Sequence, residues 1–340
     1  MEKSIAEHTK YGFYGRLKKD FPSQIIVNIT EKCNLSCIHC QHPQFVKSPH
    51  YHGLEMEDKI NTKLVQEVCK EGKDITEYLR YTSDGEPLLH PKGYQFIQEA
   101  VQDSGVPVTL TTNGTRIDHE KIKSLIDEGL FLIDISIDAY SPETYKKIRV
   151  GGHLEKTKEN IEKMIEYRNK TGSKTRIVVS FIEQPSNAHE TKQFQDYWES
   201  HGADFVVIRR LHSNAGIIES LAEDLRKLTH NKLRKPCVYP WERICLKPDG
   251  TLHYCPASWT KEALIADFHT SSIKEIWTSA QYNELRKSHL NTDFSAFPMC
   301  DRCPDWIQIR WPDEGRSYAN MIEDFSEKKE DNLWIRIKNR

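Results

Sequence analysis

Six short apolar runs alternate with amphipathic helical segments through the first part of the chain, and this alternation constrains the fold more than any other feature. The runs cover residues 24–30, 77–83, 106–112, 132–138, 175–182 and 204–211. Helical spacing occurs between them, as in Ile60, Leu64 and Val68, and Ser141-Pro142 indicates an N-cap followed by Pro at the first helical position. Alternating strands and helices form a parallel sheet with right-handed crossovers. The sequence therefore predicts an α/β barrel whose loops after the strands build the active site.

The pattern changes near Pro236. Residues 242–255 predict a β-hairpin with Asp249-Gly250 at its turn. Residues 271–290 predict one helix, opened by a capping box of Ser272 and Glu275. We therefore expect an N-terminal extension (1–23), a barrel (24–235), an auxiliary domain (236–310) and a charged C-terminal tail (311–340).

Charge and hydropathy exclude several classes of protein. The 48 Lys and Arg residues nearly balance the 50 Asp and Glu residues, so the charge gives no sign of a nucleic-acid partner. The N-terminus lacks the apolar core of a signal peptide, and no apolar run reaches membrane-spanning length. We expect a cytoplasmic protein with no membrane partner. Its nine cysteines should stay reduced there, so their clusters indicate metal rather than disulfides.

Three cysteines follow the first expected strand with C-x3-C-x2-C spacing: Cys33, Cys37 and Cys40. A disulfide uses two thiols, and a closed structural metal site uses four. Thiolates suit zinc or iron–sulfur clusters. Three ligands on a cubane cluster leave one iron open to bind a substrate or cofactor, as a catalytic zinc keeps an open position. The spacing alone leaves open a zinc site with a distant fourth ligand, and also cysteines that only pack.

The segment "CNLSCIHC" after the first barrel strand resembles the signature of radical S-adenosylmethionine (SAM) enzymes, with His39 as the aromatic residue before the last Cys. Further motifs occur in the family's order: "DGEP" (84–87), "TTNG" (111–114), "ISID" (135–138) and "IRVGG" (148–152). The resemblance implies that the three cysteines bind a [4Fe–4S] cluster with SAM at its open iron. It also implies that SAM contacts come from His39, Gly85, Glu86, Pro87, Thr112, Asn113, Ser136, Asp138 and Arg149.

For two of these residues, Gly85 and Arg149, the residue type has a physical reason. The family's Gly-Glu-Pro backbone holds the methionine amino group, and Gly85 has no Cβ to block that approach. Arg149 offers a guanidinium, which suits bidentate pairing with the SAM carboxylate. Asp84 departs from the family pattern, because many members carry a Gly at that position.

A second cysteine group follows, and its members are Cys237, Cys255, Cys300 and Cys303. Their spacing around Gly250 resembles the SPASM/twitch extensions of radical SAM enzymes, and no cysteine follows Cys303, which favours the shorter twitch version. The resemblance implies a partial (β/α)6 barrel with a small C-terminal β-hairpin/helix twitch-type domain. Four cysteines saturate one auxiliary [4Fe–4S] cluster, which can carry an electron but cannot bind substrate. A four-cysteine zinc site is the alternative.

Two cysteines remain outside these groups. Cys69 follows Val65 and Val68 on an expected helix, which predicts a buried core thiol. Cys245 lies on the hairpin strand, where packing is the favoured interpretation and a cluster ligand or hydrogen donor is the alternative.

The resemblance implies a radical SAM enzyme that cleaves SAM to a 5′-deoxyadenosyl radical and abstracts hydrogen from a substrate. A flavodoxin- or ferredoxin-type protein would donate the electron. We favour a sugar, cyclitol or amino-alcohol-like small molecule and a two-electron oxidation assisted by the auxiliary cluster, as in a cyclitol alcohol dehydrogenase of the twitch group. Arg209, Arg210 and His212 end the sixth strand as candidate bases or anion-binding groups.

Three alternatives stay open. The first is modification of a ribosomal peptide, although the two dozen or so residues before the first strand leave no room for a leader-binding domain. The second is a redox-neutral epimerisation, in which Cys245 would donate hydrogen. The third is a zinc-stabilised binding protein without catalysis.

Overall fold

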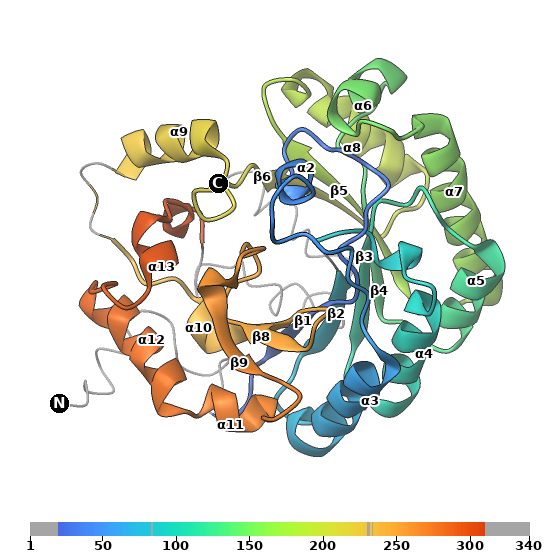
Figure 1. Cartoon of the computed structure of the whole chain (residues 1–340). Helices are drawn as coiled ribbons and strands as arrows, with labels where there is room; N and C mark the ends of the chain where they lie inside the picture. Colours follow the sequence, from blue (N-terminus) through green and yellow to red (C-terminus); the bar gives the residue numbers. More distant parts are fainter. Residues whose placement is uncertain (1–19, 83, 230–231, 233, 310–340) are drawn as a thin grey trace.

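A computed structural model describes residues 20–82, 84–229, 232 and 234–309 (Figure 1). The charged C-terminal tail and most of the N-terminal extension lie outside these residues. All six expected strands are present and pair in parallel, in the order β6-β5-β4-β3-β2-β1. Their bounds are β1 (Gln24–Asn28), β2 (Tyr78–Thr82), β3 (Val108–Thr112), β4 (Leu132–Ser136), β5 (Arg176–Glu183) and β6 (Phe205–Arg210). The predicted α/β fold is confirmed.

Helices surround the outside of these strands (Figure 1). In chain order they are α3 (Asp58–Glu67), α4 (Gly93–Asp103), α5 (His119–Asp127), α6 (Pro142–Ile148), α7 (Leu154–Thr171) and α8 (Thr191–Ser200). The short helix α2 (His42–Phe45) lies in the loop after β1, and α9 (Glu219–Thr229) lies beside α13 (Pro298–Arg302) of the C-terminal unit. Ser141 caps α6 as predicted, since its side chain accepts a hydrogen bond from the Thr144 backbone N–H. Apolar faces such as Ile122, Leu125 and Ile126 of α5 are buried against the sheet and form the core.

The C-terminal unit continues the barrel's sheet. Its strands are β7 (Arg243–Leu246), β8 (Thr251–His253) and β9 (Leu264–Asp267). Strand β7 pairs in parallel with β1, whereas β8 and β9 pair antiparallel beyond it, so the described sheet has nine strands. Gly250 stands at the β7–β8 turn with φ +79°, as a tight hairpin turn requires. The predicted hairpin therefore also extends the barrel's sheet beyond β1.

Short helices complete this unit: α10 (Tyr239–Glu242), α11 (Ile273–Trp277), α12 (Ala280–Asn291) and α13 (Pro298–Arg302). The predicted Ser272–Glu275 capping box is present and opens α11. The single helix expected over 271–290 was wrong, because the chain forms two helices there. Ser279 accepts a hydrogen bond from the Tyr282 backbone N–H and so starts α12 as a separate helix.

The prediction for Cys69 was also wrong, because its side chain is exposed. In a regular α-helix Cys69 would lie one turn after Val65, on the buried face of α3. Instead, α3 ends at Glu67 and residues Val68–Gly72 form a π-helical turn. The wider turn rotates Cys69 away from the core.

Among the residues that the structure describes, no helix is both long and apolar enough to span a bilayer.

Candidate functional site

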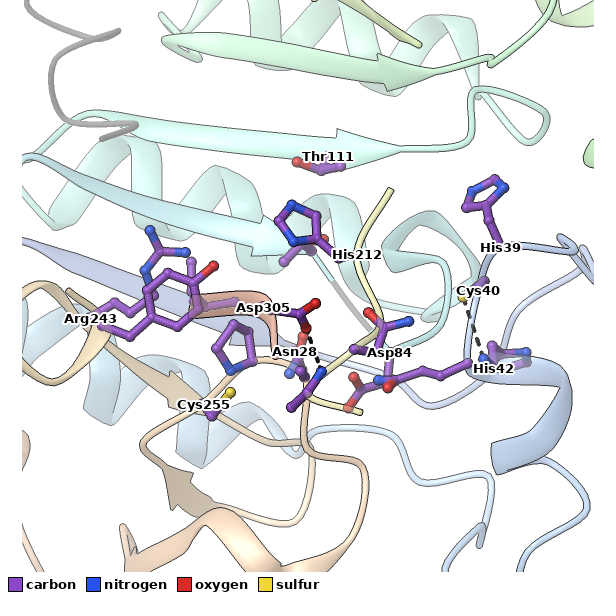
Figure 2. A pocket seen from close by; sticks show the side chains of 18 of the residues that line it. Asn28, His39, Cys40, His42, Asp84, Thr111, His212, Arg243, Cys255 and Asp305 are labelled. Carbon is purple, nitrogen blue, oxygen red and sulfur yellow. Dashed lines mark hydrogen bonds between the residues drawn. The ribbon is translucent and has the colours of Figure 1, made fainter. Parts of the chain in front are cut away.

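A single cavity of about 480 Å³ lies between the barrel and the C-terminal unit, and both cysteine groups line it (Figure 2). The cysteines on its wall are Cys33, Cys37, Cys40, Cys237, Cys255, Cys300 and Cys303. In the view of Figure 2, Cys40 and Cys255 lie toward opposite sides, with His212 and Asp84 between them. A molecule in this cavity is therefore placed between the two groups.

The first group stands on the loop after β1. Backbone hydrogen bonds join this loop to the last residue of α6 and to the segment after it, from Ile38 N to Ile148 O (3.1 Å) and from Ser36 N to Val150 O (2.9 Å). Burial raises the pKa of Cys33 to about 12 and that of Cys40 to about 11. Buried thiolates at this position therefore require a compensating positive charge, which a metal group supplies.

Arg149 reaches the first cysteine group from the end of α6. Its Nη1 lies 3.7 Å from the Cys37 sulfur, and its Nη2 lies 2.5 Å from Asp138 Oδ2. His39 Nε2 lies 3.3 Å from the same carboxylate, and burial lowers the pKa of His39 to about 4. Arg149, predicted as a partner of the SAM carboxylate, is thus already paired with a protein carboxylate. Its buried Nε has no hydrogen-bond partner in the described part of the chain.

Glu86 connects the loops after β2 and β3. Its buried carboxylate accepts hydrogen bonds from Thr112 Oγ1 (2.6 Å) and from the backbone N–H of Asn113 (2.7 Å). Burial raises the pKa of Glu86, and these two donors oppose that shift. These contacts make Glu86 a residue that positions two loops of the cavity wall.

The structure shows a reason for glycine at position 85 that differs from the one that we predicted. A Cβ at this position would lie 2.2 Å from the Lys32 carbonyl oxygen. The next backbone N–H, that of Glu86, donates to the same oxygen at 2.7 Å. The "DGEP" loop therefore packs directly on the cysteine loop, and only glycine fits there.

The remaining predicted residues divide into those that line the cavity and those that do not. His39, Gly85, Glu86, Thr112, Asn113, Ser136, Arg149 and His212 line it. Pro87, Asp138, Arg209 and Arg210 are not among its lining residues. Asp138 acts from behind Arg149, and Arg209 lies 2.5 Å from Asp134 Oδ2 inside the barrel. Of the three candidate bases, the structure brings only His212 to the cavity wall.

The second cysteine group gathers residues from three places in the C-terminal unit. Cys237 precedes α10, Cys255 follows β8, Cys300 lies in α13, and Cys303 ends α13. Burial raises the pKa of Cys237 and Cys255 well above the ordinary value, and the neighbouring thiols add to the shift. The four thiols are thus close enough to act on one another.

Both cysteine groups offer sulfur donors alone. Among the described residues, no group of three or more His, Cys, Asp or Glu side chains is arranged to hold one metal ion. Cysteine-only donor sets of three and four fit iron–sulfur clusters.

Sequence reasoning missed one contact between the barrel and the C-terminal unit. Lys247, directly after β7, lies 2.5 Å from the carboxylate of Asp84, and both side chains are nearly buried. Asp84 and Asn28 appear together on the cavity wall in Figure 2. The unusual Asp84 was a signal, but its partner lies 163 positions away and no local pattern indicates it.

Two family models match the two parts of the chain that carry the cysteine groups. Residues 27–194 match the model of the radical SAM superfamily. Residues 237–304 match the SPASM model, described as an iron–sulfur cluster-binding domain. These two domains bind SAM and iron–sulfur clusters, including an auxiliary [4Fe–4S] cluster, and each contains one of the two cysteine groups.

Curated relatives differ in what they are named for. A probable GTP 3′,8-cyclase from Methanococcus maripaludis is 31% identical over 195 residues, which is 57% of this chain and 60% of the relative. The match thus spans only about three fifths of that relative. A tungsten-containing aldehyde ferredoxin oxidoreductase cofactor-modifying protein from Pyrococcus furiosus is 24% identical over 324 residues, covering 82% of this chain and 86% of the relative.

Solved structures share the fold at low sequence identity. BtrN in complex with AdoMet and 2-DOIA has a TM-score of 0.55 at 16% identity, covering 83% of this chain and 92% of BtrN. anSMEcpe with bound AdoMet has a TM-score of 0.59 at 16% identity, covering 93% and 99%. Streptococcus suis SuiB bound to the precursor peptide SuiA has a TM-score of 0.60 at 14% identity, covering 97% and 78%. At these identities the likeness establishes the architecture alone.

Proposed function

The chain belongs to the radical SAM superfamily, and from this we propose that it oxidises an alcohol carbon of a small molecule by two electrons. The proposed substrate is a sugar, cyclitol or amino alcohol. When bound, the SAM-loaded cluster supplies reductive cleavage of SAM and removal of a hydrogen atom from the substrate. The observation that carries the proposal is the single cavity lined by both cysteine groups.

The two groups suggest different tasks. The trio of Cys33, Cys37 and Cys40 leaves a ligand position for SAM. The quartet of Cys237, Cys255, Cys300 and Cys303 saturates its cluster, so the auxiliary cluster can accept an electron but cannot hold substrate. We therefore assign these seven cysteines as ligands and the quartet as the electron-accepting site.

The proposed oxidation balances as follows. The substrate C–H bond breaks and its hydrogen atom passes to the 5′-deoxyadenosyl group derived from SAM, giving 5′-deoxyadenosine and methionine. The O–H bond would break as a C=O bond forms, the cluster held by Cys237, Cys255, Cys300 and Cys303 would accept one electron, and a base would take the proton. We propose His212 as that base because it lines the cavity. A flavodoxin- or ferredoxin-type protein supplies the electron that cleaves SAM.

The position of Cys245 favours oxidation over epimerisation. A redox-neutral reaction needs a group that returns hydrogen to the substrate. Cys245 is fully buried in β7 and is not among the residues that line the cavity. It therefore does not face a substrate bound there.

The test uses anaerobically reconstituted full-length protein with SAM, dithionite and candidate substrates from three classes: amino sugars, cyclitols and short peptides. An alcohol deuterated at the carbinol carbon should transfer its label to 5′-deoxyadenosine, with one ketone formed per 5′-deoxyadenosine. Cys33→Ala should abolish both products. Cys255→Ala should retain SAM cleavage but lose the ketone.

Other results would assign a different reaction. Label that returns to an unoxidised product indicates epimerisation. Turnover with peptides alone indicates peptide modification. Iron content gives an independent check, since two cubane clusters require about eight irons per chain.

A further inference from the structure

Arg234 lies beside the quartet and connects two of its segments. It stands three residues before Cys237, lines the cavity, and donates from Nη1 to the Asp301 carbonyl oxygen at 3.0 Å and from Nη2 to the Cys300 carbonyl oxygen. Its guanidinium also lies 4.1 Å above the ring of Phe294. These contacts hold a positive charge against the segment that carries Cys300.

The charge acts on the cysteine sulfurs themselves. Burial raises the pKa of Cys300 to about 11, and the Arg234 guanidinium is the foremost of the groups that oppose this shift. In return, Cys303, Cys300, Asp301 and Cys237 oppose the lowering of the Arg234 pKa by burial. Arg234 is thus electrostatically coupled to three of the four proposed ligands.

Three other arginines beside the cysteine groups pair with carboxylates, and Arg234 differs from them. Arg302, which acts on Cys300, pairs with Glu262. Arg149, next to Cys37, pairs with Asp138. Arg243, which acts on Cys237, pairs with Glu242. In the described part of the chain, Arg234 forms no ion pair with a carboxylate; its hydrogen bonds go to neutral carbonyls, and its buried Nε has no partner.

We propose that Arg234 raises the reduction potential of the auxiliary cluster and thereby directs the substrate's electron toward the quartet. This inference rests on the proposed function, in which the quartet accepts that electron. A positive charge near the sulfur ligands stabilises the more negative, reduced state, because net charge and surrounding dipoles set the potentials of such clusters. The Arg149–Asp138 pair gives the other cluster no comparable bias. Arg234 is a positioning and tuning residue, with no role in proton transfer.

The experiment is a redox titration followed by electron paramagnetic resonance, on full-length protein reconstituted with iron and sulfide and without substrate. The auxiliary signal is the one that does not change when SAM is added. Arg234→Met should change the reduction equilibrium of the auxiliary cluster at least tenfold toward the oxidised state. For one electron this lowers the cluster's midpoint potential by at least 59 mV. Arg234→Lys, which keeps the charge, should recover at least half of that shift.

Arg286→Met is the matched control. Arg286 also donates to carbonyls of the C-terminal unit, those of Pro240 and Trp277. Within the described residues, however, the titratable group that acts on it is Tyr282, and no cysteine does so. Its substitution should leave the potential unchanged. An unchanged midpoint in Arg234→Met, or an equal shift in Arg286→Met, would overturn the proposal.

A second neutral variant guards against a folding defect. Arg234→Gln keeps a donor for the Cys300 carbonyl but removes the charge, so it should show the same fall in potential. Loss of the auxiliary cluster in both neutral variants would make Arg234 structural and would also overturn the proposal. Because the titration contains no substrate, it can be interpreted even if the proposed alcohol oxidation is wrong. The substrate assay can likewise be interpreted if Arg234 does not affect the potential.

Discussion

Replacing Gly85 by alanine tests whether the "DGEP" loop is held by its contact with the cysteine loop. Gly85 is not among the glycines with positive φ, so its backbone conformation does not require glycine. Without a steric conflict, Gly→Ala would be neutral or would stabilise by about 0.4–1 kcal/mol through the unfolded state. Any loss of stability therefore reports the contact.

The structure sets the size of that loss. The new Cβ would lie 2.2 Å from Lys32 O and 2.7 Å from the Glu31 carbonyl carbon, so the two backbone segments must separate by about 1 Å. Overpacking of this kind costs about 1–3 kcal/mol. The separation also weakens the 2.7 Å hydrogen bond from Glu86 N to Lys32 O, which is worth about 1 kcal/mol. We expect Gly85→Ala to lower the free energy of unfolding by about 2–4 kcal/mol, a large share of a typical 5–15 kcal/mol.

The assay compares anaerobic urea unfolding, iron content and SAM cleavage in Gly85→Ala and Gly172→Ala. Gly172 caps α7 at φ +66° with no atom within 4 Å of an added Cβ, so its cost is backbone strain of about 1–2 kcal/mol. Only Gly85→Ala should also lose iron and SAM cleavage, because it displaces the loop of Cys33. The reasoning fails if Gly85→Ala matches the wild type in stability and iron content.

Two further predictions concern stability. Lys247→Met leaves the Asp84 carboxylate unpaired in a nearly buried position and should cost about 3–5 kcal/mol. Lys163→Met breaks an exposed pair and should cost less than about 1 kcal/mol; equal urea midpoints would contradict the first estimate. Burial lowers the pKa of His90 below the ordinary 6.5, and the neutral ring accepts a hydrogen bond from Lys92 N at Nδ1. The folded state therefore binds a proton at His90 less readily than the unfolded state, so the stability present above pH 6.5 is lost as pH falls. Urea midpoints between about pH 7.5 and about pH 5 should therefore fall more in the wild type than in His90→Gln, and parallel curves would refute this.

Local patterns were sufficient for most of the architecture. A strand that is buried on both faces has a continuous apolar run, and a helix cap is made by residues three apart, so both can be recognised in a short window. The errors arose where a neighbouring element changed the local outcome. Ser279 started a second helix within residues 271–290, and the π-helical turn after α3 exposed Cys69.

The site was predictable where its residues form motifs with short spacings in the sequence. The cysteine trio and quartet, and the motifs after β2, β3 and β4, indicated which loops form the cavity. Side-chain partners were not predictable in the same way. Glu86 contacts Thr112, and Arg149 pairs with Asp138, so four predicted cofactor contacts bind one another in this structure.

The sequence by itself therefore determined the α/β class, the strand order along the chain and the two cysteine groups, because each depends on residues close together in the chain. Only the tertiary structure decided that β7 pairs with β1 and that one cavity joins both groups. It also decided that Arg234, alone of four arginines beside the cysteines, forms no carboxylate pair within the described residues. Those outcomes depend on which distant backbones and charges come within bonding distance. That proximity is a property of the packed chain as a whole.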